Sequence, residues 1–358
     1  MLPSKNPGPA WNEQTRKYLE DSRRRVPRYL FRGFSPKSGG GPYDGVLLNS
    51  EQKIVPLAFA MNKGHKSIYN IPAAELYTLV CGHLVGSRIP TEFSSWSGST
   101  KTALQYARSA AQPYLAIIDT DQFIKWNQAV PIFHVPYLLA ARNPNPQPNL
   151  HSGWGHEFLA HGVIEGNGLA VANIKDLYEA GPPALYYGPY LMGAPTEDLV
   201  ASCKKSALKF NKHWAVVPVT LALLCIYSCG WHTDGSVTNA NLECIEQGLG
   251  GLKIPFQAFR DDKNAYIYGM ADPMKDLCFT QFLVVSHALQ NKQWGKGARR
   301  QQHPPIHPSQ DPTVPSQGAG TEKSSGLAVK RRRSSPAQSS RDDTKPDDPA
   351  AKRKRAKK

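Results

Sequence analysis

The chain has no long hydrophobic segment and few cysteines, and both features limit the classes of protein to which it can belong. Its most apolar run, Ala215–Cys229, is interrupted by Pro218 and is too short to cross a membrane comfortably. A buried strand or a core helix is the better prediction for this run. The N-terminal stretch lacks the apolar core of a secretory signal peptide. We therefore expect no membrane association, and we expect the 6 cysteines to be reduced thiols.

Metal-binding patterns are also scarce. Cys225 and Cys229 form the only close cysteine pair, with His213 and His232 nearby. A metal site there is conceivable, but Cys225 lies inside the apolar run, where a cysteine usually serves as a small buried hydrophobe. Cysteines in apolar settings are also poor nucleophiles, because burial disfavours the thiolate. We expect no metal.

Acidic residues are scarce at one end of the chain. The net charge is +15 over 358 residues, but residues 291–358 alone carry 17 Lys and Arg against 6 Asp and Glu, a net of +11. Aromatic and aliphatic residues nearly vanish in the same segment. Such a composition cannot bury enough apolar surface to offset the entropy of ordering, which predicts a disordered basic tail.

Two basic clusters lie in this tail, Lys330–Arg333 and Lys352–Lys358. Flexible runs of cations suit the acidic groove of a nuclear import receptor, which predicts a nuclear location, with the cytoplasm as the alternative. The acidic residues of segment 342–348 argue against a continuous DNA-binding arm. Weak non-specific binding of nucleic acid and a merely solvated tail remain open.

Three further segments differ in composition. A polar segment over 1–26 contains a charged helical patch, Glu13–Arg25. Residues 27–180 alternate short apolar runs with Gly, Pro and Ser, as a mixed α and β domain does. Residues 181–290 predict a second, helix-rich subdomain of unknown role. Its helices are expected at Glu197–Phe210, Val217–Ser228, Asn239–Gly248 and Met274–Gln290.

Arg32 is the first residue of segment 27–180 with a chemical signal. It directly follows the apolar run Tyr29–Phe31, which predicts a buried strand, as Tyr114–Asp119 does further on. A planar guanidinium in a cleft can make bidentate contacts with a phosphate or a carboxylate. Pairing with a surface acid is the equally simple alternative.

A hydroxyl-rich stretch, Phe93–Ser99, is the second signal. We expect it to be a strand-to-helix turn, with Ser99 as the N-cap of a helix that begins at Thr100. Ser95 and Ser97 lie too early to cap that helix, so their hydroxyls require another role.

Glu157 is the third signal, because it precedes an apolar stretch that predicts a strand or a buried turn. A carboxylate at the end of a core element is either paired with a cation or used in chemistry. Two histidines flank it. His156 is expected to alternate away from Glu157 into solvent, whereas His161 could line the same cleft or be an ordinary hydrogen-bonded histidine.

In this order, the arginine after a strand, the Ser-x-Ser turn and the glutamate followed by Gly162-x-Ile164 resemble the ADP-ribosyltransferases. The similarity is to the branch of the enterotoxin A chains and pierisin-like toxins, and to an uncharacterised fungal domain related to them. It covers about residues 27–180. The resemblance implies an α+β domain with a split mixed or antiparallel sheet and flanking helices. It also implies an enzyme that cleaves NAD, by glycohydrolysis or by ADP-ribosyl transfer to an unknown acceptor.

The resemblance also implies roles for individual residues. Glu157 rather than Glu165 matches the catalytic glutamate, because of its distance from the Gly-x-Ile turn. Ser95-Trp96-Ser97 matches a Ser-Thr-Ser motif whose hydroxyls support the glutamate and the nicotinamide ribose. The implied catalytic residues are Arg32, Ser95 and Glu157. The implied NAD-binding residues are Arg32, Gly33, Ser95, Trp96 and Ser97.

The sequence departs from the pattern at Gly155, where the family usually has the Glu or Gln that positions the acceptor. Glycine cannot do this, so the usual transfer to arginine is not expected. Three outcomes stay open: NAD hydrolysis alone, transfer to another acceptor, or an inactive module of the same fold that binds a nucleotide or a protein. A nuclear protein that binds nucleic acid through its basic tail is a further alternative.

Overall fold

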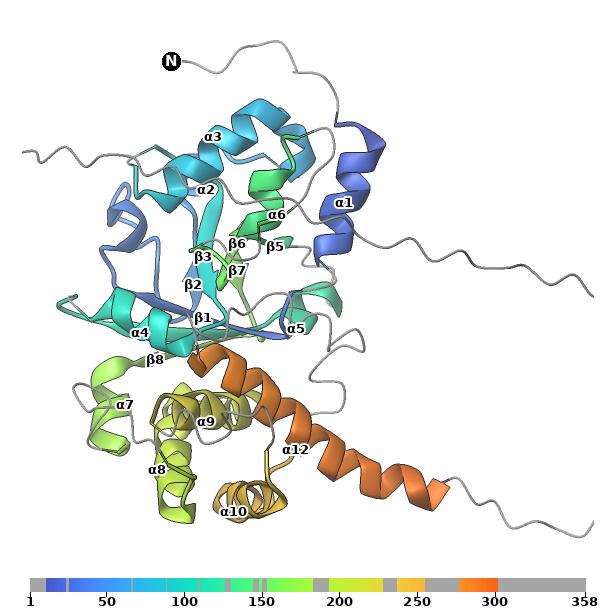
Figure 1. Ribbon diagram of the computed structural model, residues 1–358. Coiled ribbons are helices and arrows are strands. Elements are labelled where there is room, and N and C mark those ends of the chain that lie inside the picture. The colour runs from blue at the N-terminus through green and yellow to red at the C-terminus, as the bar shows by residue number, and fades with distance from the viewer. Residues whose placement is uncertain are drawn as a thin grey trace, which may run out of the picture. The chain divides into compact units, whose positions relative to one another are not determined.

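Short β-branched and aromatic runs form the strands at the centre of the computed structural model (Figure 1). The strands are β1 (Tyr29–Phe34), β2 (Lys53–Ile54), β3 (Phe93–Ser97), β4 (Tyr114–Asp119), β5 (Ile132–His134), β6 (Glu157–His161), β7 (Ile164–Glu165) and β8 (Leu169–Asn173). Six of them form an antiparallel sheet in the order β5-β6-β3-β1-β4-β8, and β2 pairs with β7. The structure describes residues 11–23, 26–65, 67–87, 89–108, 110–125, 130–143, 148–149, 153–182, 193–227, 237–254 and 277–301.

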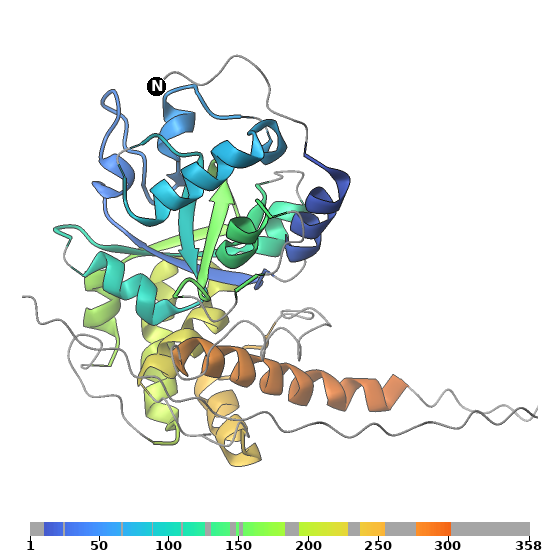
Figure 2. The ribbon, with the colours of Figure 1, turned by 45° about the horizontal axis from the view of Figure 1, so that its top comes forward.

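The large sheet is divided into two halves at the joint between β1 and β3. Strand β1 pairs with β4 along its whole length, but with β3 at a single position, Phe31 opposite Ser97. Strand β3 pairs in turn with β6 from Phe93 to Ser97. Figures 1 and 2 show β1 running across the direction of β3 and β6. The predicted α+β class is confirmed, and every strand pair in the described residues is antiparallel.

The two halves enclose a hydrophobic core between them. Because side chains alternate along a strand, Leu30 and Phe34 of β1 face this core while Tyr29 and Phe31 face the other way. Trp96 of β3 and Phe158 of β6 enter the same core from the second half. Burial of aromatic and aliphatic side chains thus holds the halves together where few backbone hydrogen bonds do.

Helices cover the outer face of each half. They are α1 (Glu13–Arg23), α2 (Leu57–Ala60), α3 (Ala73–Leu84), α4 (Thr100–Ala107), α5 (Thr120–Lys125), α6 (Val135–Ala140), α7 (Ile174–Ala180), α8 (Glu197–Ala207), α9 (His213–Tyr227), α10 (Asn239–Leu249) and α12 (Leu277–Gln301). Helices α1, α3 and α6 pack on the half that contains β3, and α8, α9 and α12 pack on the half that contains β1 (Figure 1).

The helices after residue 180 lie close to their expected positions, but they do not form a separate subdomain. Leu223 of α9 and Phe282 of α12 share one core with Phe31 of β1. All described residues fall in one compact unit, Met1–Pro304. The apolar run that contains Pro218 is α9, a helix buried on nearly every side, and this explains why it cannot stand apart from the sheet.

Two further expectations are corrected. The tail boundary expected at residue 291 falls inside α12, which continues to Gln301. The stretch Phe93–Ser97 is strand β3 rather than a turn, and the helix cap alone is as expected: the hydroxyl of Ser99 accepts a hydrogen bond from the Thr102 amide at 3.2 Å. The predicted helix near the N-terminus and the two predicted strands are confirmed as α1, β1 and β4.

The basic clusters Lys330–Arg333 and Lys352–Lys358, and the cysteine at 229 with His232, lie outside the described residues. Tail disorder, nuclear import and weak binding of nucleic acid therefore stay predictions. Within the described ranges, no helix has the length and apolar character needed to cross a membrane. The same ranges contain no cluster of three or more His, Cys, Asp or Glu side chains suited to a metal ion.

Candidate functional site

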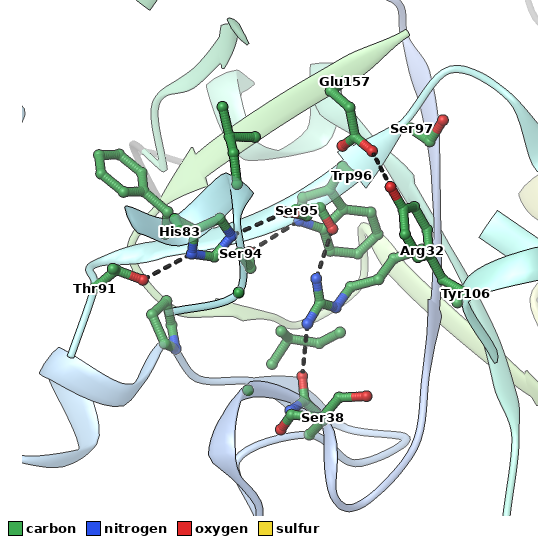
Figure 3. Close-up of a pocket in the computed structure, with 18 of the residues that line it drawn as sticks. Arg32, Ser38, His83, Thr91, Ser94, Ser95, Trp96, Ser97, Tyr106 and Glu157 are labelled. Carbon is green, nitrogen blue, oxygen red and sulfur yellow. Dashed lines mark hydrogen bonds between the residues drawn. The ribbon is translucent and has the colours of Figure 1, made fainter. Parts of the chain in front are cut away.

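A pocket of about 890 Å³ opens at the joint between the two halves of the sheet (Figure 3). Strands β1 and β3 pair at a single position and diverge from it. Side chains occupy the space between them. All six residues that the sequence singled out line this pocket: Arg32, Gly33, Ser95, Trp96, Ser97 and Glu157. They come from β1, β3 and β6, so the fold brings together residues that are more than a hundred positions apart.

Arg32 lies within β1 rather than after it, and its guanidinium crosses the joint to β3. Its Nη1 donates to the carbonyl oxygen of Ser95 at 2.6 Å, and its Nη2 donates to Oδ1 of Asn49 at 3.4 Å. Its Nε is buried and has no hydrogen-bond partner among the described residues. Burial lowers the pKa of Arg32 to about 10, although the nearby Glu157 acts in the opposite direction. The side chain therefore stays cationic at neutral pH.

The partners of Arg32 are neutral, which leaves its positive charge largely uncompensated. Asn49 is itself fixed, since its Nδ2 donates to the carbonyl oxygen of Ser38 at 2.8 Å. Lys37, from the same loop, is a second cation on the pocket lining, whereas Glu157 is the only acidic residue among the described residues that line it. A cleft with this balance of charge favours an anionic ligand.

Ser95 is held by a histidine that the sequence did not mark. The Nε2 of His83, on α3, lies 2.9 Å from the hydroxyl of Ser95, and the Nδ1 lies 2.7 Å from the hydroxyl of Thr91. Burial and the nearby Arg32 lower the pKa of His83 to about 4. A neutral imidazole thus fixes the orientation of the Ser95 side chain (Figure 3).

Ser97 and Trp96 differ in what they present to the pocket. The hydroxyl of Ser97 accepts a hydrogen bond from the Ser99 amide at 3.0 Å. Trp96 points to the opposite face of β3, where it is 1 % exposed and its indole donates to the hydroxyl of Ser94. Trp96 is thus mainly a residue of the core between the two halves, although it borders the pocket.

Gly33 borders the pocket, but a packing contact explains why it is glycine. A Cβ at this position would lie 1.7 Å from the carbonyl oxygen of Ala103 on α4. No side chain can be accommodated there without moving the helix. The glycine therefore permits the close approach of α4 to β1, which was not evident from the sequence.

Glu157 begins β6, directly opposite Ser97 of β3. It is 2 % exposed, and the hydroxyl of Tyr106, on α4, donates to its Oε1 at 3.1 Å. Burial raises the pKa of Glu157 to about 7, and the hydrogen bond from Tyr106 and the charge of Arg32 limit the rise. A carboxylate that titrates near neutrality beside a pocket is a common feature of functional sites.

Of the two histidines that flank Glu157, His156 departs from its expected position, whereas His161 is the ordinary hydrogen-bonded histidine that was one of its two expected roles. His156 lies close to the carboxylate, with its Nε2 3.9 Å from Oε1. His161 does not line the pocket, because it lies at the far end of β6, where its Nε2 is 2.5 Å from Oε2 of Glu92. Gly155 lies in the turn before β6, and its carbonyl oxygen bonds to the buried His134 at 2.9 Å.

A second buried carboxylate lies outside the pocket, just before β3. Besides the contact with His161, Oε1 of Glu92 lies 2.5 Å from Nδ1 of His65. Burial alone would raise the pKa of Glu92, but the hydrogen bonds from these two histidines outweigh it and lower that pKa. The group fastens the loop that contains His65 to the ends of β3 and β6.

Residues 25–168 match a family model described only as a domain of unknown function, DUF7587. The matched range contains every residue named above as lining the pocket, and it ends just before β8. Searches of curated proteins and of solved structures find no match.

Proposed function

We propose that the pocket binds NAD and that Glu157 promotes cleavage of the bond between nicotinamide and ribose. One observation carries this proposal: Arg32, Ser95 and Glu157, three residues that resemble the catalytic set of the ADP-ribosyltransferases, line a single pocket. The volume of about 890 Å³ lies within the range of small-molecule and cofactor sites.

The charges of the pocket suit the pyrophosphate of NAD. The guanidinium of Arg32 is buried, stays protonated and has no carboxylate partner within hydrogen-bond distance among the described residues. A diphosphate would supply the missing negative charge, with Lys37 available at the same lining.

Glu157 would act on the ribose at the other end of the ligand. Breaking the bond between nicotinamide N1 and ribose C1′ sends the bonding electron pair to nicotinamide and leaves positive charge on the sugar, as in glycoside cleavage. A carboxylate beside the ribose stabilises that charge and can accept a hydrogen bond from a ribose hydroxyl. Water or another nucleophile then forms the new bond at C1′.

The acceptor is the least determined part of the reaction. At Gly155 there is no side chain to position an acceptor, and the backbone carbonyl of this residue is already bonded to His134. The proposal therefore includes hydrolysis, with water as acceptor, and transfer to an acceptor other than arginine. The same glycine supports a second candidate, a module that binds the nucleotide without cleaving it.

The test measures nicotinamide release from NAD by the full chain, together with NAD affinity by calorimetry. Glu157→Gln should lower the turnover number on the order of 10²–10³-fold, because it removes the charge that stabilises the transition state. The matched control is Glu165→Gln, an exposed glutamate on β7, and it should retain wild-type turnover.

Three results would count against the proposal. Equal turnover by wild type and Glu157→Gln would remove Glu157 from the chemistry. Binding of NAD without turnover by either would favour the binding module, and no binding at all would refute the NAD assignment.

A further inference from the structure

Tyr106 is placed where it can control the carboxylate of Glu157. It lies on α4, a helix fixed by the Ser99 cap at its start and by the contact of Ala103 with Gly33. Tyr106 is 60 % exposed and borders the pocket, yet its hydroxyl reaches inward to Oε1 of the buried Glu157 at 3.1 Å. Because most of Tyr106 is exposed while its hydroxyl is hydrogen-bonded to Glu157, this side chain acts through the hydrogen bond rather than through packing.

The hydrogen bond distinguishes the two oxygens of Glu157. Oε1 accepts from Tyr106, while Oε2 has no hydrogen-bond partner within the described part of the chain. Figure 3 shows the Tyr106 hydroxyl bonded to one carboxylate oxygen, with Ser97 close by. A carboxylate oxygen without a protein partner at a pocket lining is the atom that can accept from a ligand.

We propose that Tyr106 is a positioning residue, which holds Oε1 of Glu157 so that Oε2 is presented to the ribose of the substrate. This inference rests on the proposed NAD-cleaving function. Tyr106 itself does not need to contact the reacting atoms, and it keeps its proton throughout the working range, since burial and the adjacent Glu157 raise its pKa to about 12.

The positioning has a consequence for the ionisation of Glu157. The charged and titratable groups that face this carboxylate are Arg32 from β1, His156 from the preceding turn and the Tyr106 hydroxyl from α4. A phenol that donates to a carboxylate favours the ionised form, so removing it should raise the pKa of Glu157 above about 7. The activity would then require a higher pH.

The experiment compares Tyr106→Phe with a matched control, Tyr69→Phe. Tyr69 also donates to a glutamate, Glu20, at 2.6 Å, but this pair lies outside the pocket. The pH dependence of NAD turnover is measured for wild type and both variants. In parallel, the ionisation of Glu157 is followed by NMR of side-chain-labelled glutamate, with Glu157→Gln identifying the signal.

In Tyr106→Phe, both the NMR midpoint and the acid limb of turnover should move up by about one pH unit, from the loss of one hydrogen bond to a charged group. Turnover should then fall about fivefold at pH 7 and less than about twofold at pH 8.5. Tyr69→Phe should leave both curves unchanged. A Tyr106→Phe protein with wild-type midpoint and acid limb would overturn the positioning role.

The two proposals can fail separately. If wild type releases no nicotinamide, the proposed function fails, and the NMR midpoint alone decides whether Tyr106 controls Glu157. If wild type is active and turnover falls equally at every pH in Tyr106→Phe, the reaction stands and the role assigned to Tyr106 is wrong.

Discussion

Glu157 and Glu92 are two buried carboxylates at opposite ends of the same pair of strands, and they are satisfied very differently. The ladder between β3 and β6 runs from Phe93 opposite His161 to Ser97 opposite Glu157. Both oxygens of Glu92 meet a histidine, which lowers the pKa of Glu92. Glu157 receives one tyrosine hydroxyl and has a pKa of about 7. Both oxygens of Glu92 thus have a protein partner, which favours stability. Glu157 has a partner for one oxygen among the described residues, and its other oxygen stays available beside the pocket.

The comparison predicts that Glu92→Gln and Glu157→Gln change the free energy of unfolding in opposite directions. Glu92→Gln should destabilise the protein by about 3 kcal/mol at pH 7, because it removes a buried carboxylate whose two oxygens each form a hydrogen bond with a histidine. Urea unfolding of the variant and of wild type measures the difference. Because the folded-state pKa of Glu92 is lowered, its contribution is present at neutral pH and lost in acid, so the gap should narrow below pH 4. An equally large gap at pH 3 would contradict this account.

Glu157→Gln should instead stabilise the protein, by about 3 kcal/mol at pH 8.5. The folded-state pKa of Glu157 is raised from 4.5 to about 7, so ionisation costs stability as the pH rises through that window. The gain should shrink to a few tenths of a kcal/mol near pH 4.5, where the folded-state carboxyl is protonated and the unfolded-state carboxyl is half ionised. Thermal unfolding at pH 4.5, 7 and 8.5 tests this, and a variant less stable than wild type at pH 8.5 would show that Glu157 is a structural residue like Glu92.

The smallest effect is expected at the exposed edge of the Glu92 cluster. The side chain of His65 is 39 % exposed, whereas that of His161 is 2 % exposed. His65→Ala should therefore cost only about 1 kcal/mol of unfolding free energy at pH 7, the usual net value of a partly solvated hydrogen bond. If His65→Ala lost as much unfolding free energy as Glu92→Gln, the Glu92 carboxylate would be stabilised mainly by His65 of the loop rather than by His161 of β6.

The sequence predicted those parts of the site that depend on strand neighbours. The resemblance to the ADP-ribosyltransferases grouped Arg32, Ser95 and Glu157, and the strands that carry them belong to one sheet. Of the two roles left open for His161, the structure shows the ordinary hydrogen-bonded histidine, and four residues of strand separate it from Glu157 by roughly 13 Å. His156 was placed away from the cleft by an alternation that holds only within a strand, and the strand begins one residue later.

Other parts required the tertiary structure. Tyr106 and His83 lie on helices, and nothing in their local sequence indicates that their polar atoms reach into a pocket formed by strands. The resemblance assigned Trp96 to the ligand as the middle residue of a Ser-Thr-Ser motif, but in a strand it points opposite to Ser95 and Ser97. The helices after residue 180 were found by periodicity, but periodicity does not tell whether a helix packs on a distant strand.

The joint between β1 and β3 also has an evolutionary consequence. The cores on the two sides of the joint are held by their own side chains, and the polar residues that line the pocket contribute little to either. Substitutions among these residues can therefore alter ligand preference at small cost to folding. Gly33 is the exception, because α4 packs directly against it. Related chains that diverge in ligand should vary around the joint and keep this glycine.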